Sequence, residues 1–119
     1  MTNDTGSSLI RSDEVKNLII YGVEGQQIGQ IEHLMIDPVS GHVSYAVVSF
    51  HGQTTDDLFP LPWSLLKYDS NLNGYVTATP LKDLSNAPRY PSGRGWNWRD
   101  RAAIRSIDTH YGIRIIHGG

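Results

Sequence analysis

Short apolar stretches separated by turn-forming residues make up most of the chain before residue 87. Val43–Phe50 is the strongest of them, because β-branched and aromatic residues fill it and little polarity interrupts it, which is typical of a central strand. Shorter extended segments are predicted over 17–26, 27–37 and 58–61, and on both sides of Asn73-Gly74. These are five or six short strands with a turn about every ten residues, a spacing that predicts a small β-barrel.

The segment that precedes Pro38 carries two conflicting patterns. Ile28, Ile31 and Leu34 are three residues apart, as on one face of a helix. Gly29 and Pro38 oppose a helix, because glycine weakens helices and the residue before proline avoids helical backbone. We therefore expect a strand with a kink or bulge near Gly29.

Turn chemistry completes the predicted barrel. In the turn 37–42, Pro38 presets φ and Gly41 can take a positive φ. Asn73-Gly74 favours a two-residue type I′ turn, and Pro62–Leu66 suits a single helical turn that begins with proline. The residues expected to fill the barrel core are Ile19, Ile28, Ile36, Val43, Tyr45, Val47, Leu65 and Val76.

The chain changes character after residue 86. Residues 87–95 are a proline- and glycine-rich connector, and 97–112 are predicted to form one short helix that Asn97 caps and Gly112 ends. Asp100 would lie in its first turn, where it complements the helix dipole. The apolar face of this helix is formed by Ile104, Ile107 and Tyr111.

Three regions are therefore expected. Residues 1–8 are rich in turn formers and predicted to be disordered, and residues 9–86 form the barrel. Residues 87–119 hold the connector, the helix and a short terminal strand at 113–116. Because so short a helix is unstable alone in water, we expect this last region to pack on its own barrel or on that of a sister subunit.

Charge is distributed unevenly along the chain, whose formal net charge is −2. Residues 1–85 contain four cationic and ten anionic side chains, a net charge of −6. Residues 86–119 contain six arginines and two aspartates, a net charge of +4. Two interpretations remain open: the basic region docks on the acidic domain of its own or a sister chain, or it reaches an external acidic partner, a protein or RNA.

Motifs give little support for catalysis. The chain has 119 residues and a mass of 13.3 kDa, enough for one domain, and it has no cysteine for a disulfide, a thiolate zinc site or a nucleophile. Its five histidines have no metal-binding spacing, and neither a nucleophile elbow nor a phosphate-binding glycine motif occurs. The neighbouring carboxylates Asp56 and Asp57 would point to opposite sides of an extended segment. We expect no catalytic residue, no metal and no cofactor.

Targeting segments are also lacking. Met1–Ser8 is polar and does not resemble a secretory signal, and no apolar stretch is long enough to cross a membrane. The expectation is a cytoplasmic protein without membrane insertion.

Three segments resemble landmarks of the PRC-barrel family. Gly25–Ser49 resembles the core signature of this family, and Phe59–Leu66 (FPLPWSLL) resembles its second landmark. Leu81–Tyr90 (LKDLSNAPRY) is similar to the segment that follows the barrel in stand-alone members. The family includes the cytoplasmic domain of the H subunit of photosynthetic reaction centres and the C-terminal domain of a bacterial ribosomal-RNA-maturation factor. The present chain looks like a stand-alone member.

The resemblance implies an all-β fold, a small SH3-like β-barrel of five or six strands followed by the short C-terminal helix. It also implies a protein-interaction or assembly module and not an enzyme. The chain departs from the family in one place: many stand-alone members carry a glycine-rich apolar loop after the long strand, whereas residues 51–57 are polar and acidic here. If that loop contacts partners in relatives, the partner of this chain differs.

Tryptophan and arginine are the residue types that dominate interface hot spots, and both gather after the barrel. The candidate partner-binding residues are Trp96, Trp98, Arg99, Arg101, Arg105 and Tyr111. An alternative for the two tryptophans is that they cap their own or a sister barrel. We predict a non-enzymatic, homo-oligomeric adaptor, with a homodimer as the expected form, that binds itself and an unidentified protein. The alternative function is a factor associated with RNA or ribosome precursors through the arginine-rich segment.

Overall fold

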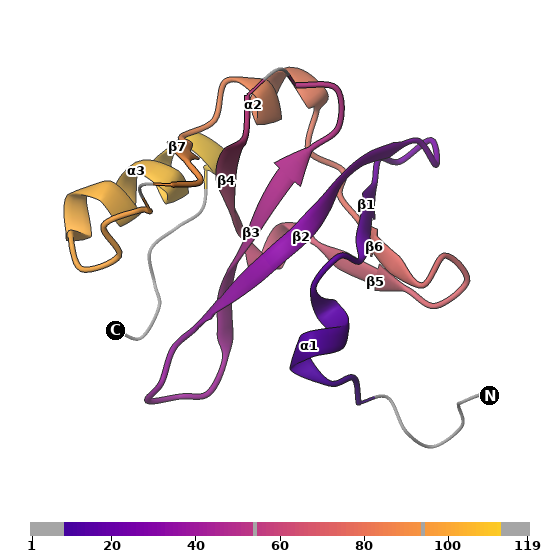
Figure 1. Ribbon diagram of the computed structural model, residues 1–119, viewed down its shortest axis with the longest axis horizontal. Coiled ribbons are helices and arrows are strands. Elements are labelled where there is room, and N and C mark those ends of the chain that lie inside the picture. Colours follow the sequence, from indigo (N-terminus) through magenta and orange to yellow (C-terminus); the bar gives the residue numbers. More distant parts are fainter. Residues whose placement is uncertain (1–8, 54, 94, 113–119) are drawn as a thin grey trace.

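A computed structural model describes residues 9–53, 55–93 and 95–112. Within them seven strands form one sheet in the order β5-β6-β1-β2-β3-β4-β7 (Figure 1). The strands are β1 Ile19–Tyr21, β2 Gln27–Ile36, β3 Val43–Phe50, β4 Asp57–Pro62, β5 Lys67–Asp69, β6 Gly74–Val76 and β7 Tyr90–Pro91. Neighbouring strands are antiparallel, except that β1 and β6 run parallel.

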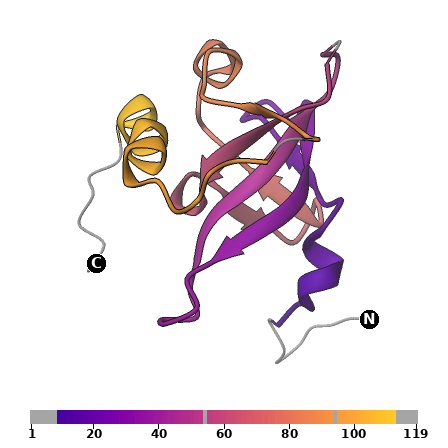
Figure 2. The ribbon, with the colours of Figure 1, turned by 60° about the vertical axis from the view of Figure 1, so that its left-hand side comes forward.

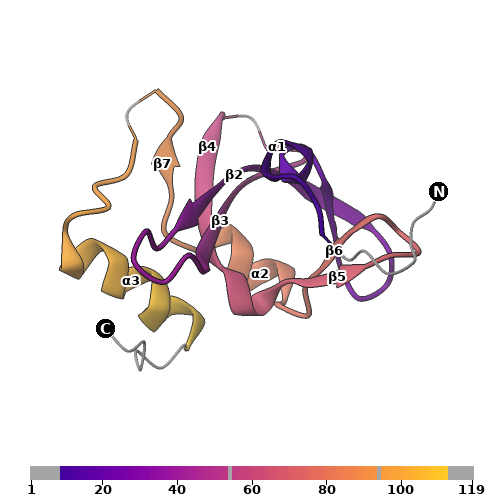
Figure 3. The ribbon, with the colours of Figure 1, turned by 90° about the horizontal axis from the view of Figure 1, so that it is seen from below.

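The sheet curves but does not close, because β5 and β7 stand at the two ends of the strand order (Figure 3). The predicted small all-β domain with a short C-terminal helix is confirmed, although seven strands replace the five or six expected. The predicted strand 113–116 and the N-terminal residues 1–8 lie outside the described residues.

Short helical elements accompany the sheet. They are α1 Ser12–Val15, the 3-10 helix η1 Trp63–Leu65, α2 Leu81–Ser85 and α3 Arg101–Tyr111. η1 is the single helical turn expected after Pro62. α3 lies beside β4, on the far side of the molecule from α1 (Figures 1 and 2).

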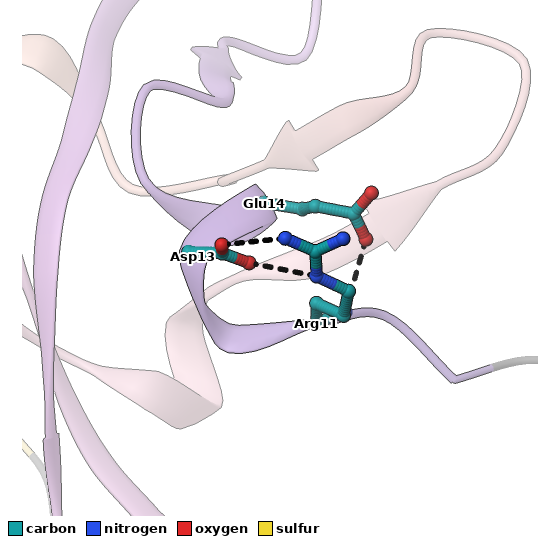
Figure 4. Close-up of polar contacts among 3 residues, drawn as sticks. All are labelled: Arg11, Asp13 and Glu14. Carbon is teal, nitrogen blue, oxygen red and sulfur yellow. Dashed lines mark hydrogen bonds and ion pairs between the residues drawn. The ribbon is translucent and has the colours of Figure 1, made fainter.

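Helix α1 begins with a compact set of polar contacts at its exposed N-terminus (Figure 4). The Arg11 guanidinium donates to both carboxylate oxygens of Asp13, at 3.1 and 2.7 Å. The Arg11 backbone N–H donates to Glu14 Oε1 at 3.0 Å, which satisfies a group outside the helix. These contacts fix the start of a helix whose last residue, Val15, is buried in the core.

A bulge near Gly29 is confirmed, and it explains the mixed pattern of β2. Ile20 lies opposite Gly29 whereas Tyr21 lies opposite Gln27, so Ile28 is an extra residue on β2. A bulge shifts the alternation of side chains by one position. Ile28 therefore enters the core although its neighbour Gly29 is also buried.

A second bulge lies further along β2. Ile31 pairs with Val48 and His33 pairs with Val47, which leaves Glu32 as an extra residue. The two bulges bring apolar residues three positions apart onto one side of the strand. The helix-like spacing in the sequence is therefore a property of a twice-bulged strand.

The predicted core is wrong at most positions. The structure buries Ile20, Tyr75 and Leu66 where Ile19, Val76 and Leu65 were expected. Successive strand residues face opposite ways, so an error of one residue in register exchanges the buried and exposed sets. Ile36 is half exposed on a projecting hairpin, and Val43 is only partly buried. The core consists of Val15, Ile20, Ile28, Ile31, Ala46, Val48, Phe59, Leu61, Leu66, Tyr75, Leu84 and Ala87.

Strand β3 is buried on both faces, as its continuous apolar sequence predicts. Ala46 and Val48 belong to the core. Tyr45 and Val47 are equally buried but lie outside that core, on the face that meets the C-terminal region. The predicted burial of Tyr45 and Val47 is confirmed, but they are buried on the other face of β3 and not in the main core cluster.

The turn between β5 and β6 differs from the type I′ turn predicted for Asn73-Gly74. Asp69 pairs with Gly74, so the loop has four residues, and of the two predicted turn residues only Asn73 has a positive φ, of 51°. Gly74 is itself a strand residue, and a Cβ there would lie 2.6 Å from the carbonyl oxygen of Ile19. Glycine is needed here for the close approach of β6 to β1.

Helix α3 begins later than predicted. Asp100 is its N-cap, and its side chain accepts a hydrogen bond from the Ala102 backbone N–H at 2.9 Å. Asn97, expected as the cap, lies in a preceding turn where its side chain accepts from the Arg99 N–H. Gly112 ends the helix with φ of 70°, as expected.

Candidate interaction surface

The C-terminal helix is attached to the sheet through a buried polar contact. Tyr45 on β3 donates a hydrogen bond of 2.7 Å to Asp108 Oδ1 on α3. Asp108 is only 2% exposed, and its neighbour Ile107 is fully buried. Burial, and secondarily the contact with Asp108, raises the pKa of Tyr45, so the phenol stays protonated and remains a donor. The contact fixes both the position and the rotation of α3 on the sheet.

The two candidate tryptophans extend this attachment along the connector. The Trp98 ring lies 5.5 Å from that of Tyr45 and 6.3 Å from that of Trp96, between ring centroids. Trp96 in turn lies 5.7 Å from Tyr90 on β7. These four aromatic residues form a continuous row that we call the aromatic strap. Both tryptophans are partly buried in it and face their own domain.

The connector carries the first charged contacts between the basic and acidic parts of the chain. Arg89 forms an ion pair of 3.6 Å with Asp57 and lies over the Phe59 ring at 5.6 Å. Ser92 donates a hydrogen bond of 2.8 Å to Asp56. Asp56 and Asp57, at the start of β4, thus hold the connector through an ion pair and a hydrogen bond.

Tyr111 and His110 fasten the end of α3. Tyr111 packs partly buried against the barrel core, and this burial, with the Asp83 charge as a smaller cause, raises the pKa of its phenol. His110 Nε2 lies 2.7 Å from the backbone carbonyl oxygen of Asp83. Tyr111 is therefore placed as part of the attachment and not on the outer side of the helix.

The remaining candidates, Arg99, Arg101 and Arg105, behave differently. All three are exposed, and none forms an ion pair with another residue in the part of the chain that the structure describes. We call them the arginine face. Arg105 also borders an open groove of about 650 Å³ between α3 and residues 86–88. The structure thus divides the six predicted residues into three aromatic residues that anchor and three arginines that project.

Tyr45, Tyr90 and Asp108 were missed as site residues. The signal for Tyr45 was present, because a strand apolar on both faces needs a second covering layer. Asp108 follows Ile107 and lies between Ile104 and Tyr111, within the apolar stripe, where an acidic residue points to a buried partner. Nothing in the sequence identifies that partner as Tyr45.

Searches for chemistry in the described residues give two findings. No cluster of three or more histidine, aspartate or glutamate side chains is arranged to hold a metal ion in residues 9–53, 55–93 and 95–112. In the same residues no helix is both long and apolar enough to cross a bilayer.

Comparison with known proteins agrees with the arrangement of the sheet. The family model of the PRC-barrel domain matches residues 8–85, about two thirds of the chain, and the chain therefore belongs to the PRC-barrel family. The PRC barrel is a general protein-interaction and assembly fold, and the family is one of non-catalytic binding domains. No curated protein matches the chain. α3 and the arginine face lie beyond the matched residues, so they are additions to the family domain.

Proposed function

We propose that this chain is a non-enzymatic, cytoplasmic adaptor that assembles with itself and presents the arginine face of α3 to an acidic protein. The observation that carries the proposal is the exposure of Arg99, Arg101 and Arg105 without ion pairs among the described residues. Arg101 and Arg105 lie on α3, which a buried contact holds, and Arg99 lies just before its N-cap. The nearby aspartates that could have neutralised them are used elsewhere: Asp100 caps the helix and Asp108 binds Tyr45.

The anchoring makes the arginine face suitable for binding. A helix fixed by Tyr45 and the aromatic strap has lost its freedom before a partner arrives, so less conformational entropy is lost on association. Guanidinium groups form forked, charge-assisted hydrogen bonds with carboxylates, which favours an acidic protein surface. Because salt screens the attraction between exposed arginines and carboxylates, association through this face is sensitive to salt.

Affinity capture from the protein's own cells tests this proposal, with nuclease present. The full chain is compared with Arg99→Gln/Arg101→Gln/Arg105→Gln and with a matched control, Lys16→Gln/Lys67→Gln/Lys82→Gln, which removes three exposed cations from the barrel region. We expect one stoichiometric protein to be retained by the wild type and by the lysine variant and lost by the arginine variant. Retention by all three would exclude the arginine face as the binding surface.

RNA binding through the same face is the second candidate function, because exposed arginines also contact phosphates. It is tested by titrating the chain with a short single-stranded RNA at several salt concentrations. RNA binding predicts an affinity that falls steeply with salt and a slope reduced by roughly one unit for each phosphate-contacting arginine removed. Capture of ribosomal proteins that disappears with nuclease would favour this function over the acidic protein.

A further inference from the structure

The hairpin of β2 and β3 extends well beyond the rest of the sheet. β1 pairs with β2 only as far as Gln30, and the backbone of Ile31 is the last to bond to the segment before β1, through Leu18 and Asn17. From Glu32 to Ile36, β2 has β3 on one side and no described strand on the other. We call residues 32–44 the arm; β4 still flanks β3 at Tyr45, and the end of the hairpin beyond it projects from the body of the molecule (Figures 1 and 2).

The open edge of the arm contains neither lysine nor proline within residues 32–36. Edge strands are protected by these residues, by inward-pointing charge or by bulges, and of the last this edge has the bulge at Glu32. The edge 32–36 reads Glu-His-Leu-Met-Ile, and its one carboxylate is occupied, since Glu32 Oε2 accepts from Ser49 at 2.6 Å and from Gln30 at 3.1 Å. The end strand β5, by contrast, carries an exposed lysine, Lys67.

Apolar side chains are exposed along the same arm. Ile36 is 50% exposed at the end of β2, and Val39 is 94% exposed in the turn that follows. Leu34 and Met35 between them and the body are partly buried. A free backbone edge next to exposed apolar side chains fits a β-strand as its occupant, because such a strand satisfies the backbone groups and covers the side chains together.

We propose that the occupant is a second copy of this chain, paired antiparallel along residues 32–36 with Leu34 at the two-fold axis. A two-fold axis through one strand edge makes the two strands antiparallel and satisfies both open edges at once. In this register His33 lies opposite Met35 of the second copy. The pairing stops where β1 begins, because the backbone of Ile31 is already bonded.

Charge permits two copies to meet through the edge 32–36. Contact between the arginine faces of two copies would bring like charges together, whereas residues 33–36 carry no formal charge. On the edge itself the one formal charge, that of Glu32, is turned onto its own strand pair. The inference rests on the self-assembly that forms part of the proposed function and does not depend on the arginine face.

The test uses the full chain and the double variant Ile36→Lys/Val39→Lys, whose exposed positions tolerate lysine in the folded state. Sedimentation over a range of concentrations should give the wild type twice the mass of the 13.3 kDa chain and the variant the mass of one chain. The matched control is Val23→Lys/Leu72→Lys, which places the same charges at two other exposed apolar positions and should remain a dimer. Circular dichroism and Tm establish that both variants are folded.

Amide hydrogen exchange tests the backbone pairing. Outward-facing amides within residues 33–36 should exchange at least tenfold more slowly in the wild-type dimer than in the Ile36→Lys/Val39→Lys variant, and their protection should increase with protein concentration. Protection that does not depend on concentration would mean that the chain covers its own edge, and it would overturn the proposal. A dimer that survives in the variant would overturn the arm as its interface but leave self-assembly intact, whereas a monomeric wild type would overturn both.

Discussion

The phenolic oxygen of Tyr45 donates a 2.7 Å hydrogen bond to the carboxylate of Asp108, joining the central strand to the C-terminal helix across 63 residues of chain. Tyr45 lies on the face of β3 that turns away from the barrel core, so the contact attaches a second layer to the outer face of the sheet. This layer lies outside the residues that match the family. The bond therefore joins the part of the chain that matches the family to a part that lies beyond the match.

Removal of the Tyr45 hydroxyl should weaken this attachment. Tyr45→Phe keeps the ring against Trp98 but leaves the buried Asp108 without that donor, which we expect to cost about 1–3 kcal/mol in the free energy of unfolding. Urea unfolding measures the change. Tyr68→Phe is the matched control, because it removes an exposed hydroxyl bonded to Asn73 and should cost less than about 1 kcal/mol. Equal losses in the two variants would contradict a special role for the Tyr45 bond.

The free energy of unfolding should fall at alkaline pH, partly because of Tyr45. Burial, and then the contact with Asp108, raises the pKa of Tyr45 above the ordinary value of 10.0. The folded state thus favours the protonated phenol, and the stability this provides is complete below about pH 10 and lost as the pH rises further. Unfolding of the wild type and Tyr45→Phe across this range should show a shallower alkaline decline in the variant. Parallel curves would show that other groups cause the decline.

The positions of strands and turns can be anticipated from the sequence, but strand register cannot. The spacing of Ile28, Ile31 and Leu34 fits both a helix and a strand, because each of two bulges adds one extra residue to β2. A bulge has no strong local sequence signal. Likewise, Asn73-Gly74 by itself predicts a two-residue turn, whereas Gly74 is a strand residue that allows the close contact of β6 with β1, a distant segment. Local chemistry identifies that a turn is present, and tertiary contacts decide its type.

The composition of the C-terminal segment predicts the candidate site, and the fold separates its residues into buried aromatic side chains and exposed arginines. Tryptophan and arginine in one segment predict an interface, but composition does not say which of them face inward. Trp98 faces inward because it packs against the Tyr45 ring on the outer face of β3. Arg101 faces outward because the apolar stripe on the opposite side of α3 packs against the sheet. That division depends on which face of β3 is left uncovered by the barrel, which a single sequence does not reveal.

Gly74 should be intolerant of any side chain. A Cβ at this position would meet the backbone oxygen of Ile19 at 2.6 Å, so β6 would have to move away from β1. We expect Gly74→Ala to destabilise the domain by about 1–3 kcal/mol, as overpacking does in a tight interior. Gly93→Ala is the control, because a Cβ there has open space around it, and its effect should stay within about 0.5 kcal/mol. Chemical denaturation of the two variants decides the matter, and a neutral Gly74→Ala would show that the strands can separate without cost.

Ile107 should hold α3 on the sheet, and its truncation should loosen the helix before the barrel. Ile107 is fully buried on the face of α3 that carries Asp108, whereas Ile104 on the same helix is partly exposed. Ile107→Ala should therefore cost about 2–5 kcal/mol if the helix and barrel unfold together, and less if α3 detaches alone. Hydrogen exchange distinguishes these cases by residue. We expect faster exchange in α3, with β2 and β3 still protected, and a smaller change for the control Ile104→Ala. Uniform loss of protection through both α3 and the sheet would instead mean that the C-terminal layer is an integral part of the folding unit, because the barrel could not then retain its structure without it.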